Sequence, residues 1–231
     1  MKKILFNDKY GLTRAVLEGR KTQTRRIAYC GEIKNVRFGY GLEGKEEDKC
    51  FLLDGWMQVA ESRYSVGELV AVAQCYSKIM DYYHSLGKVS ERKVSEQELI
   101  FWNAMRIMES TGDDSAMRGD DNKMFVKADL MPHHIKMTNI RIERLQDISD
   151  DDCFKEGVYH DSADGAGLNW ISCKDMKAQN ELLRHEWHGK KGLWFWDTPQ
   201  KAYAALIDRI SGKGTWEKNP WVFVYDFELV D

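Results

Sequence analysis

The sequence lacks any apolar run of the length that a membrane-spanning helix needs. Such a helix takes about 20 consecutive apolar residues, and no run approaching that length occurs in the chain of 231 residues. The start carries two lysines and a short apolar stretch, but Asn7-Asp8-Lys9 ends that stretch too early for a secretory signal peptide. We therefore expect a soluble, cytoplasmic protein that has no membrane partner.

Cysteine is scarce, and no two cysteines form a C-x-x-C pair. This argues against a disulfide framework and against a zinc site built on thiolates. The two histidines of His185-Glu186-Trp187-His188 are three positions apart, whereas a zincin helix needs four. We expect no metal and no cofactor, and reduced thiols at all five cysteines, which are Cys30, Cys50, Cys75, Cys153 and Cys173.

Charge of one sign is not in large excess over the whole chain, but it is unevenly distributed. The net charge is −3, whereas residues 1–26 hold eight basic and two acidic side chains, a balance of +6. The remaining residues therefore carry −9, so the chain is no polycation that coats nucleic acid. A basic cluster on an acidic body indicates either a site for an anionic ligand, with phosphate as the usual candidate, or a solvated basic face.

Apolar periodicity and cap residues predict a mixture of helices and strands. Ser149 is a suitable N-cap with three acidic residues after it, and Thr198-Pro199 is a suitable start for a later helix. The expected helices cover residues 9–18, 90–110, 149–157, 174–188 and 199–212. The expected strands cover residues 3–6, 22–26, 50–60, 67–76, 136–145 and 221–230.

We interpret the chain as one α+β domain, residues 1–231, with a barrel-like sheet and surrounding helices. Between about residues 77 and 124 the pattern changes to a helix followed by a polar, acidic loop. Segments of this kind on a compact domain commonly carry function. We interpret this stretch as a helical insertion, and as a candidate contact surface for a protein partner.

Four segments in order resemble the ASCH family, in its phage and prophage branch. The first is residues 9–26, which contain Gly19-Arg20-Lys21-Thr22-Gln23-Thr24-Arg25-Arg26. The others are residues 125–132, residues 140–149 followed by Glu156-Gly157-Val158, and residues 215–222. The resemblance runs over about residues 3–76 and 125–231, and it implies a PUA-like β-barrel. Residues 71–75 lack the Arg and Glu that the family usually has there.

The residues of the first segment already suggest chemistry. On a strand, Thr24 and Arg26 point to the same face about 7 Å apart, and Lys21 lies at the turn before them. A hydroxyl, an amine that accepts a proton when desolvated, and a planar cation are then close together. The plain alternative is that Lys21 and Arg26 bind phosphate without chemistry and that Thr24 is an ordinary strand residue.

The resemblance supplies the carboxylate that this stretch lacks. Small bacterial ASCH enzymes that hydrolyse N(4)-acetylcytidine use a lysine, a threonine and a glutamate beside an arginine. Matched by motif, the catalytic set becomes Lys21, Thr24 and Glu156, with Arg26 nearby. Glu156 is expected to act as a general acid or base, or to orient Lys21. The further ligand-binding candidates are Arg20, Arg25, Arg26, His133 and Trp216.

Three functions remain open on the sequence. The first is a basic cleft that binds RNA or a modified nucleotide or nucleoside. The second is an amidohydrolase that cleaves N(4)-acylated cytidine. The third is a phage or prophage accessory protein that binds another protein through the insertion. Trp216 also has two interpretations, since it is suited either to base stacking or to core packing.

Overall fold

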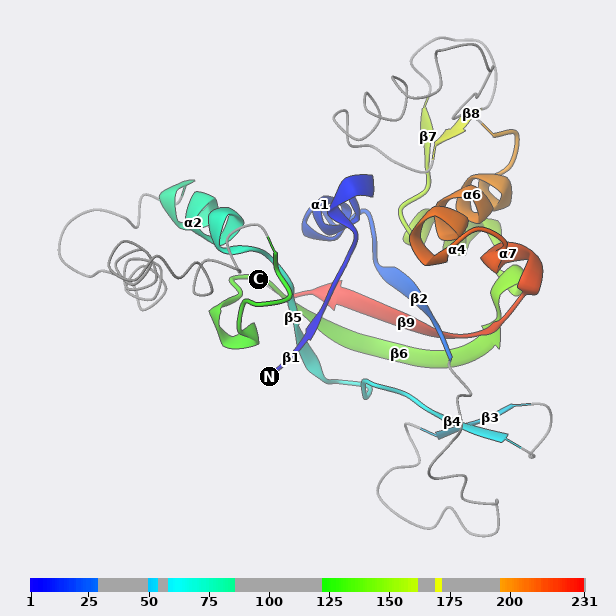
Figure 1. Cartoon of the computed structure of the whole chain (residues 1–231), viewed down its shortest axis with the longest axis horizontal. Coiled ribbons are helices and arrows are strands. Elements are labelled where there is room, and N and C mark those ends of the chain that lie inside the picture. The colour runs from blue at the N-terminus through cyan, green and yellow to red at the C-terminus, as the bar shows by residue number, and fades with distance from the viewer. Residues whose placement is uncertain (29–49, 54–57, 86–121, 162–168, 172–195, 231) are drawn as a thin grey trace, which may run out of the picture. The chain divides into compact units, whose positions relative to one another are not determined.

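The computed structural model describes residues 1–28, 50–53, 58–85, 122–161, 169–171 and 196–230 (Figure 1). The chain divides into two compact units. Unit 1 comprises Met1–Phe6, Leu69–Ile135 and Val230–Asp231, and unit 2 comprises Asn7–Glu68 and Lys136–Leu229. The helices expected at 90–110 and 174–188 lie outside the described residues, as does most of the proposed insertion.

The described strands form a mixed five-stranded sheet and two separate strand pairs. β1 is parallel to β5 and β2 is antiparallel to β9 in the large sheet, whose strands lie in the order β1 (Lys2–Ile4), β5 (Leu69–Val72), β6 (His134–Arg144), β9 (Trp221–Leu229) and β2 (Gln23–Ile27). The α+β class is therefore confirmed. The described strands are not closed into a barrel, because β1 and β2 are the two edges of the sheet and no pairing joins them.

Unit 1 is built on the parallel pair of β1 (Lys2–Ile4) and β5 (Leu69–Val72). The Lys3 ammonium donates hydrogen bonds to the backbone carbonyls of Lys123, Met124 and Val126, at 3.0, 2.7 and 2.6 Å. These bonds hold residues 123–126 beside the first strand. The unit also contains the 3-10 helix η4 (Ala128–Leu130) and α2 (Tyr76–Ser85), which begins at the start of the proposed insertion.

Unit 2 begins with a 3-10 helix, η1 (Asp8–Tyr10), and α1 (Leu12–Leu17). Gly19 follows with a φ of 70°, a left-handed conformation that glycine adopts without a Cβ clash, and the chain then enters β2 (Gln23–Ile27). The expected helix, glycine stop and strand are all present. β2 pairs with β9 (Trp221–Leu229), which brings together residues about 200 positions apart.

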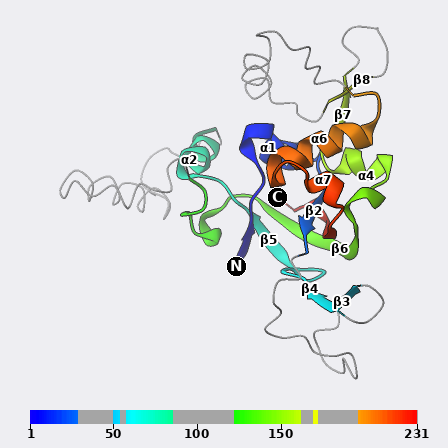
Figure 2. The same ribbon diagram turned by 45° about the vertical axis from the view of Figure 1, so that its right-hand side comes forward.

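The rest of unit 2 surrounds these two strands. β6 (His134–Arg144) starts in unit 1 and continues into unit 2, and the 3-10 helix η5 (Leu145–Asp147) follows it. α4 (Asp150–Lys155) packs on β2 and on α6 (Pro199–Ser211), and α6 packs on α7 (Thr215–Lys218) (Figure 2). The short pairs are β3 (Cys50–Leu53) with β4 (Gln58–Glu61), and β7 (Tyr159–Asp161) with β8 (Asn169–Ile171).

The core of unit 2 lies between the sheet and α4, α6 and α7. Its buried members come from η5, α4, α6 and β9, with residues on either side of α4 completing the set: Leu145, Ile148, Cys153, Val158, Ala202, Tyr203, Ile207, Val222 and Val224. Within the described ranges, no helix is long and apolar enough to cross a membrane.

Ser149 fixes the start of α4, as the sequence predicts. Its hydroxyl accepts a hydrogen bond from the backbone N–H of Asp152 at 3.1 Å, and three acidic residues occupy the first turn. Side-chain oxygens at an N-cap accept hydrogen bonds from amides that have no partner inside the helix. Acidic residues in the first turn stabilise the helix by interacting with the positive end of its dipole. Thr198 caps α6 in the same way, at 3.3 Å from the Lys201 N–H.

We predict that Ser149→Ala lowers the free energy of unfolding by about 1 kcal/mol, because the Asp152 N–H loses its acceptor. Urea unfolding followed by tryptophan fluorescence measures the change. Ser211→Ala, at an exposed position in the last turn of α6, is the matched control and should change stability by less than about 0.5 kcal/mol. Equal effects of the two substitutions would contradict the capping role.

Candidate functional site

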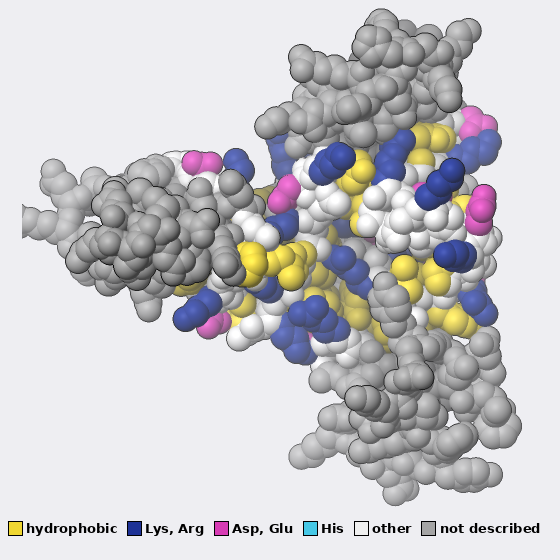
Figure 3. Space-filling model, viewed as in Figure 1, with side chains coloured by type: hydrophobic (Ala, Val, Ile, Leu, Met, Phe, Trp, Pro, Cys, Tyr) yellow, Lys and Arg dark blue, Asp and Glu magenta, His cyan; other side chains and the backbone are white. Residues whose placement is uncertain are grey.

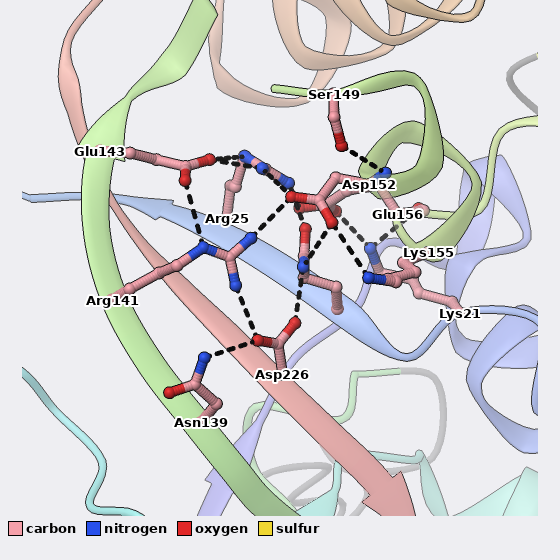
Figure 4. A network of polar contacts seen from close by, with 11 residues as sticks. Lys21, Arg25, Asn139, Arg141, Glu143, Ser149, Asp152, Lys155, Glu156 and Asp226 are labelled. Atoms are coloured by element: carbon pink, nitrogen blue, oxygen red, sulfur yellow. Dashed lines mark hydrogen bonds and ion pairs between the residues drawn. The ribbon is translucent and has the colours of Figure 1, made fainter. Parts of the chain in front are cut away.

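The candidate site lies where β2 faces α4 inside unit 2 (Figure 4). Gln23 and Arg25 are alternate residues of β2 and therefore share a face of the strand. α4 supplies Asp152 from its first turn, and Glu156 is its C-cap residue. The backbone N–H of Thr22 donates to the Lys155 carbonyl at 3.0 Å, which ties the start of the strand to the end of the helix.

Lys21 and Glu156 form a buried ion pair. The Lys21 Nζ lies 2.5 Å from Glu156 Oε2 and 2.9 Å from the backbone oxygen of the same residue. The two side chains are 2% and 5% exposed, so water contributes little to their solvation. The contact between these two residues, 135 positions apart, is one that the family resemblance leads us to expect.

Burial lowers the pKa of the Lys21 ammonium below its usual 10.5. Glu156 opposes this change by its charge and its hydrogen bond, while the positive charges of Arg26 and Arg25 add to it. Gly157 follows with a φ of 102°, and a Cβ there would lie 3.9 Å from the Lys21 Cβ and Cδ. The aliphatic part of Lys21 thus packs against the backbone that carries its partner.

Arg25 binds three carboxylates at once. Its guanidinium contacts Glu143 at 2.5 Å, Asp152 at 3.0 Å and Glu156 at 3.3 Å, and it also donates to the Gln23 side-chain oxygen. The side chain is fully buried. A planar guanidinium with five N–H donors suits such an arrangement, because its donors point outward in fixed directions.

Arg141 of β6 extends the network towards β9. Its guanidinium contacts Asp152 at 2.6 Å, Asp226 at 2.7 Å and Glu143 at 3.2 Å. The Gln23 amide bridges the same two aspartates, at 2.6 Å from Asp226 and 3.2 Å from Asp152. Two groups at the edge of the network complete it, with Asn139 donating to Asp226 at 3.1 Å and Lys155 to Asp152 at 3.2 Å.

Positive and negative charges balance within this network. Its cations are Lys21, Arg25, Arg141 and Lys155, and its carboxylates are Glu143, Asp152, Glu156 and Asp226. Although burial opposes the effect, hydrogen bonds from Arg25, Lys155 and Gln23 lower the pKa of the Asp152 carboxyl, which keeps it ionised. The network as a whole therefore has no excess positive charge with which to attract a polyanion.

Thr24 and Arg26 alternate with the network residues along β2. They pair in register with Tyr225 and Phe223 of β9, so strand alternation places them on the face opposite Gln23 and Arg25. Thr24 is buried and Arg26 is half-buried. The structure thus joins Lys21 to Glu156 directly. Thr24 lies between Gln23 and Arg25 in the sequence, on the opposite face of β2.

The remaining sequence candidates lie at three different places. Arg20 is half-buried and pairs with Glu18 at 2.7 Å. Trp216 of α7 packs on the core of unit 2, with its ring edge-on to Tyr203 at a centroid distance of 6.3 Å. His133 belongs to unit 1, where its ring meets Tyr82 at 4.5 Å. Their roles in ligand binding stay predictions.

Basic side chains are nevertheless frequent on the described surface that Figure 3 shows, where acidic ones are fewer. Arg14, Lys155 and Lys201 are among the exposed cations of unit 2, with side chains that are 71%, 50% and 61% exposed. Each of these three pairs with a carboxylate. These three surface cations are therefore neutralised locally, as Lys21 and Arg25 are in the buried network.

Sequence reasoning missed most of the carboxylates that surround Arg25. Glu143 and Arg141 alternate with isoleucines in β6, and Asp226 interrupts the apolar last strand. The available sequence signal for the network was the presence of charged residues at alternate positions of these strands, because alternate residues of a strand point to the same face. The described residues hold no cluster of three His, Cys, Asp or Glu side chains arranged for a metal ion.

Comparison with known proteins finds no related protein. No protein-family model matches the chain, and neither the curated proteins nor the solved structures contain a significant match. The resemblance to the ASCH family therefore depends on the sequence motifs alone.

We predict that Arg25→Lys lowers the free energy of unfolding by about 2–4 kcal/mol, because a compact ammonium lacks the extended planar set of donors with which the guanidinium reaches three carboxylates. Urea unfolding at neutral pH measures the loss. Arg14→Lys keeps an exposed pair with Glu18 and should cost less than about 0.5 kcal/mol. A small loss in Arg25→Lys, similar to that of the control, would show that the network contributes little to the fold.

Proposed function

We propose that the chain is an ASCH-type protein with a PUA-like fold, and that it binds a small modified nucleoside or nucleotide beside the Lys21–Glu156 pair. The proposal is supported by one observation above all. Two residues that the ASCH resemblance assigns to one site, 135 positions apart, are in hydrogen-bond contact. Arg25, a second cation of the motif, also contacts Glu156 at 3.3 Å, and its positive charge helps to lower the pKa of Lys21.

The charge balance favours a small ligand over a long RNA. Binding of a nucleic-acid strand depends on cations that replace counterions along many phosphates. Here Lys21 and Arg25 are buried and already bound to carboxylates, and Arg20 pairs with Glu18. Recognition of a nucleoside depends instead on a few directed hydrogen bonds, which buried polar groups of fixed orientation provide.

We predict that the full chain binds cytidine, cytidine monophosphate or N(4)-acetylcytidine, and that affinity falls at least tenfold in the double variant Lys21→Met/Glu156→Gln. The double variant removes both buried charges together, so neither is left uncompensated. Isothermal titration calorimetry measures binding, and a thermal melt checks that the variant is folded. Lys201→Met, at an exposed helix position, is the control and should bind like the wild type.

Salt dependence separates the small-ligand proposal from RNA binding. A nucleotide with one phosphate should lose at most about fourfold in affinity between 50 and 200 mM salt, whereas a single strand with about 6–10 contacted phosphates loses roughly 300- to 16,000-fold. Tight, strongly salt-dependent binding of a 20-nucleotide RNA, with no binding of the three small probes, would contradict the proposal.

Amide hydrolysis is the second candidate function, and the environment of Lys21 favours it. An amine whose pKa is lowered by burial is neutral in a larger fraction of molecules and can accept a proton. In the proposed reaction a water molecule adds to the amide carbonyl carbon and gives a proton to Lys21, because Thr24 lies on the opposite face of β2 from Gln23 and Arg25. The C–N bond then breaks, and the leaving amine takes up a proton from the Lys21–Glu156 pair.

We predict that the rate of N(4)-acetylcytidine hydrolysis rises with pH and levels off below the usual lysine pKa of 10.5. The sign follows because the neutral amine is the active form, and a lowered pKa means that this form predominates at a lower pH. Release of cytidine, followed by absorbance, measures the rate. Lys21→Arg keeps the positive charge but cannot lose its proton, so we expect a loss of about 10²-fold or more. Retained activity in that variant would exclude Lys21 as the base.

A further inference from the structure

The Tyr203 side chain carries a buried hydroxyl that no described residue pairs with. Tyr203 lies in the middle of α6 and is 2% exposed. Its hydroxyl oxygen has no hydrogen-bond partner among the described residues. Buried polar groups in folded proteins are nearly always paired, so an unpaired hydroxyl in the core needs an explanation.

This hydroxyl lies beside the Lys21–Glu156 site. The Arg25 guanidinium carbon is 6.0 Å from the centroid of the Tyr203 ring. Burial raises the pKa of the hydroxyl well above 10.0, the negative charge of Glu156 adds to this, and Arg25 and Arg26 oppose it. The hydroxyl is therefore within electrostatic range of three residues of the motif, and it stays protonated, so it is available as a hydrogen-bond donor.

A second buried tyrosine shows the usual arrangement. Tyr225 of β9 is 1% exposed, and its hydroxyl lies 3.0 Å from the Ser62 Oγ, which also bonds the Tyr64 backbone. The fold thus pairs a tyrosine hydroxyl on one side of β9, whereas it leaves Tyr203 unpaired beside the site. Phenylalanine would fill the same core position without an unpaired hydroxyl, which indicates that the hydroxyl serves a purpose other than packing.

We propose that the Tyr203 hydroxyl is a ligand-binding group that donates a hydrogen bond to an uncharged oxygen of the ligand, such as the carbonyl of a pyrimidine base. The inference rests on the proposed function, since it adds a residue to the same site. A donor that has no partner among the described residues can give specificity, because a ligand without an oxygen at that position leaves it unpaired. Glu156 and Arg25 are charged groups of the site, and the Tyr203 hydroxyl adds an uncharged hydrogen-bond donor.

The test compares Tyr203→Phe with Tyr225→Phe in the full chain, using cytidine and N(4)-acetylcytidine as probes. In Tyr203→Phe the melting temperature of the unliganded protein should rise or stay unchanged, because an unpaired buried hydroxyl is removed. Affinity for the probes should fall about 3- to 10-fold, the loss of one hydrogen bond. Tyr225→Phe should instead lower the melting temperature, because the Ser62 hydroxyl loses a partner.

The outcomes separate this inference from the proposed function. If the wild type binds either probe and Tyr203→Phe binds it equally well, the inference is wrong while the proposed function stands. If Tyr203→Phe lowers the melting temperature as Tyr225→Phe does, the hydroxyl has a structural partner and the inference is wrong whatever happens to affinity. If the wild type binds neither probe, the proposed function and the inference are both overturned.

Discussion

The burial of the Arg25 guanidinium is the constraint on which the candidate site depends. A fully buried cation is tolerated only when enough acceptors surround it, and Arg25 has three carboxylates and a side-chain amide oxygen around it. Those acceptors come from β2, β6 and α4, so the cation fixes the spacing between the sheet and the helix. Glu156 is thereby held where Lys21 reaches it. The position of the Lys21–Glu156 pair is thus a consequence of satisfying the neighbouring charge of Arg25.

The same constraint changes the meaning of the basic segment near the start of the chain. As a sequence, residues 1–26 have a net charge of +6, which suggests attraction of anions. In the fold, carboxylates from distant segments neutralise Lys21 and Arg25, and Glu18 pairs with Arg20. The charges of Lys21, Arg25 and Arg20 therefore act mainly on the carboxylates that they contact. In the function that we propose, the site would select its ligand by the direction of its hydrogen bonds and by the protonation state of Lys21, more than by long-range attraction.

Local features were predictable from the sequence, and distant contacts were predictable only in part. The Ser149 cap, the left-handed Gly19 and the Thr198-Pro199 start each depend on residues a few positions apart, and each is confirmed. The Lys21–Glu156 contact was expected only through the ASCH resemblance, because no local pattern connects residues 135 positions apart. The partners of Arg25 were missed, since alternation in β6 shows which face Glu143 occupies but not what lies opposite. The closed barrel was wrong for the described strands, because closure depends on pairing between edges, which strand patterns do not encode.

The pairing of β2 with β9 also has a consequence for synthesis. The strand that carries Gln23 and Arg25 is made about 200 residues before residues 221–229, which are its neighbour among the described strands of the sheet. Until residues 221–229 are made, β2 has no β9 to pair with. At 5–20 residues per second, synthesis of the roughly 200 residues between them takes about 10–40 s. During that interval the early segment exposes cations and an unpaired strand edge, which is when a nascent chain of this topology most needs protection from aggregation.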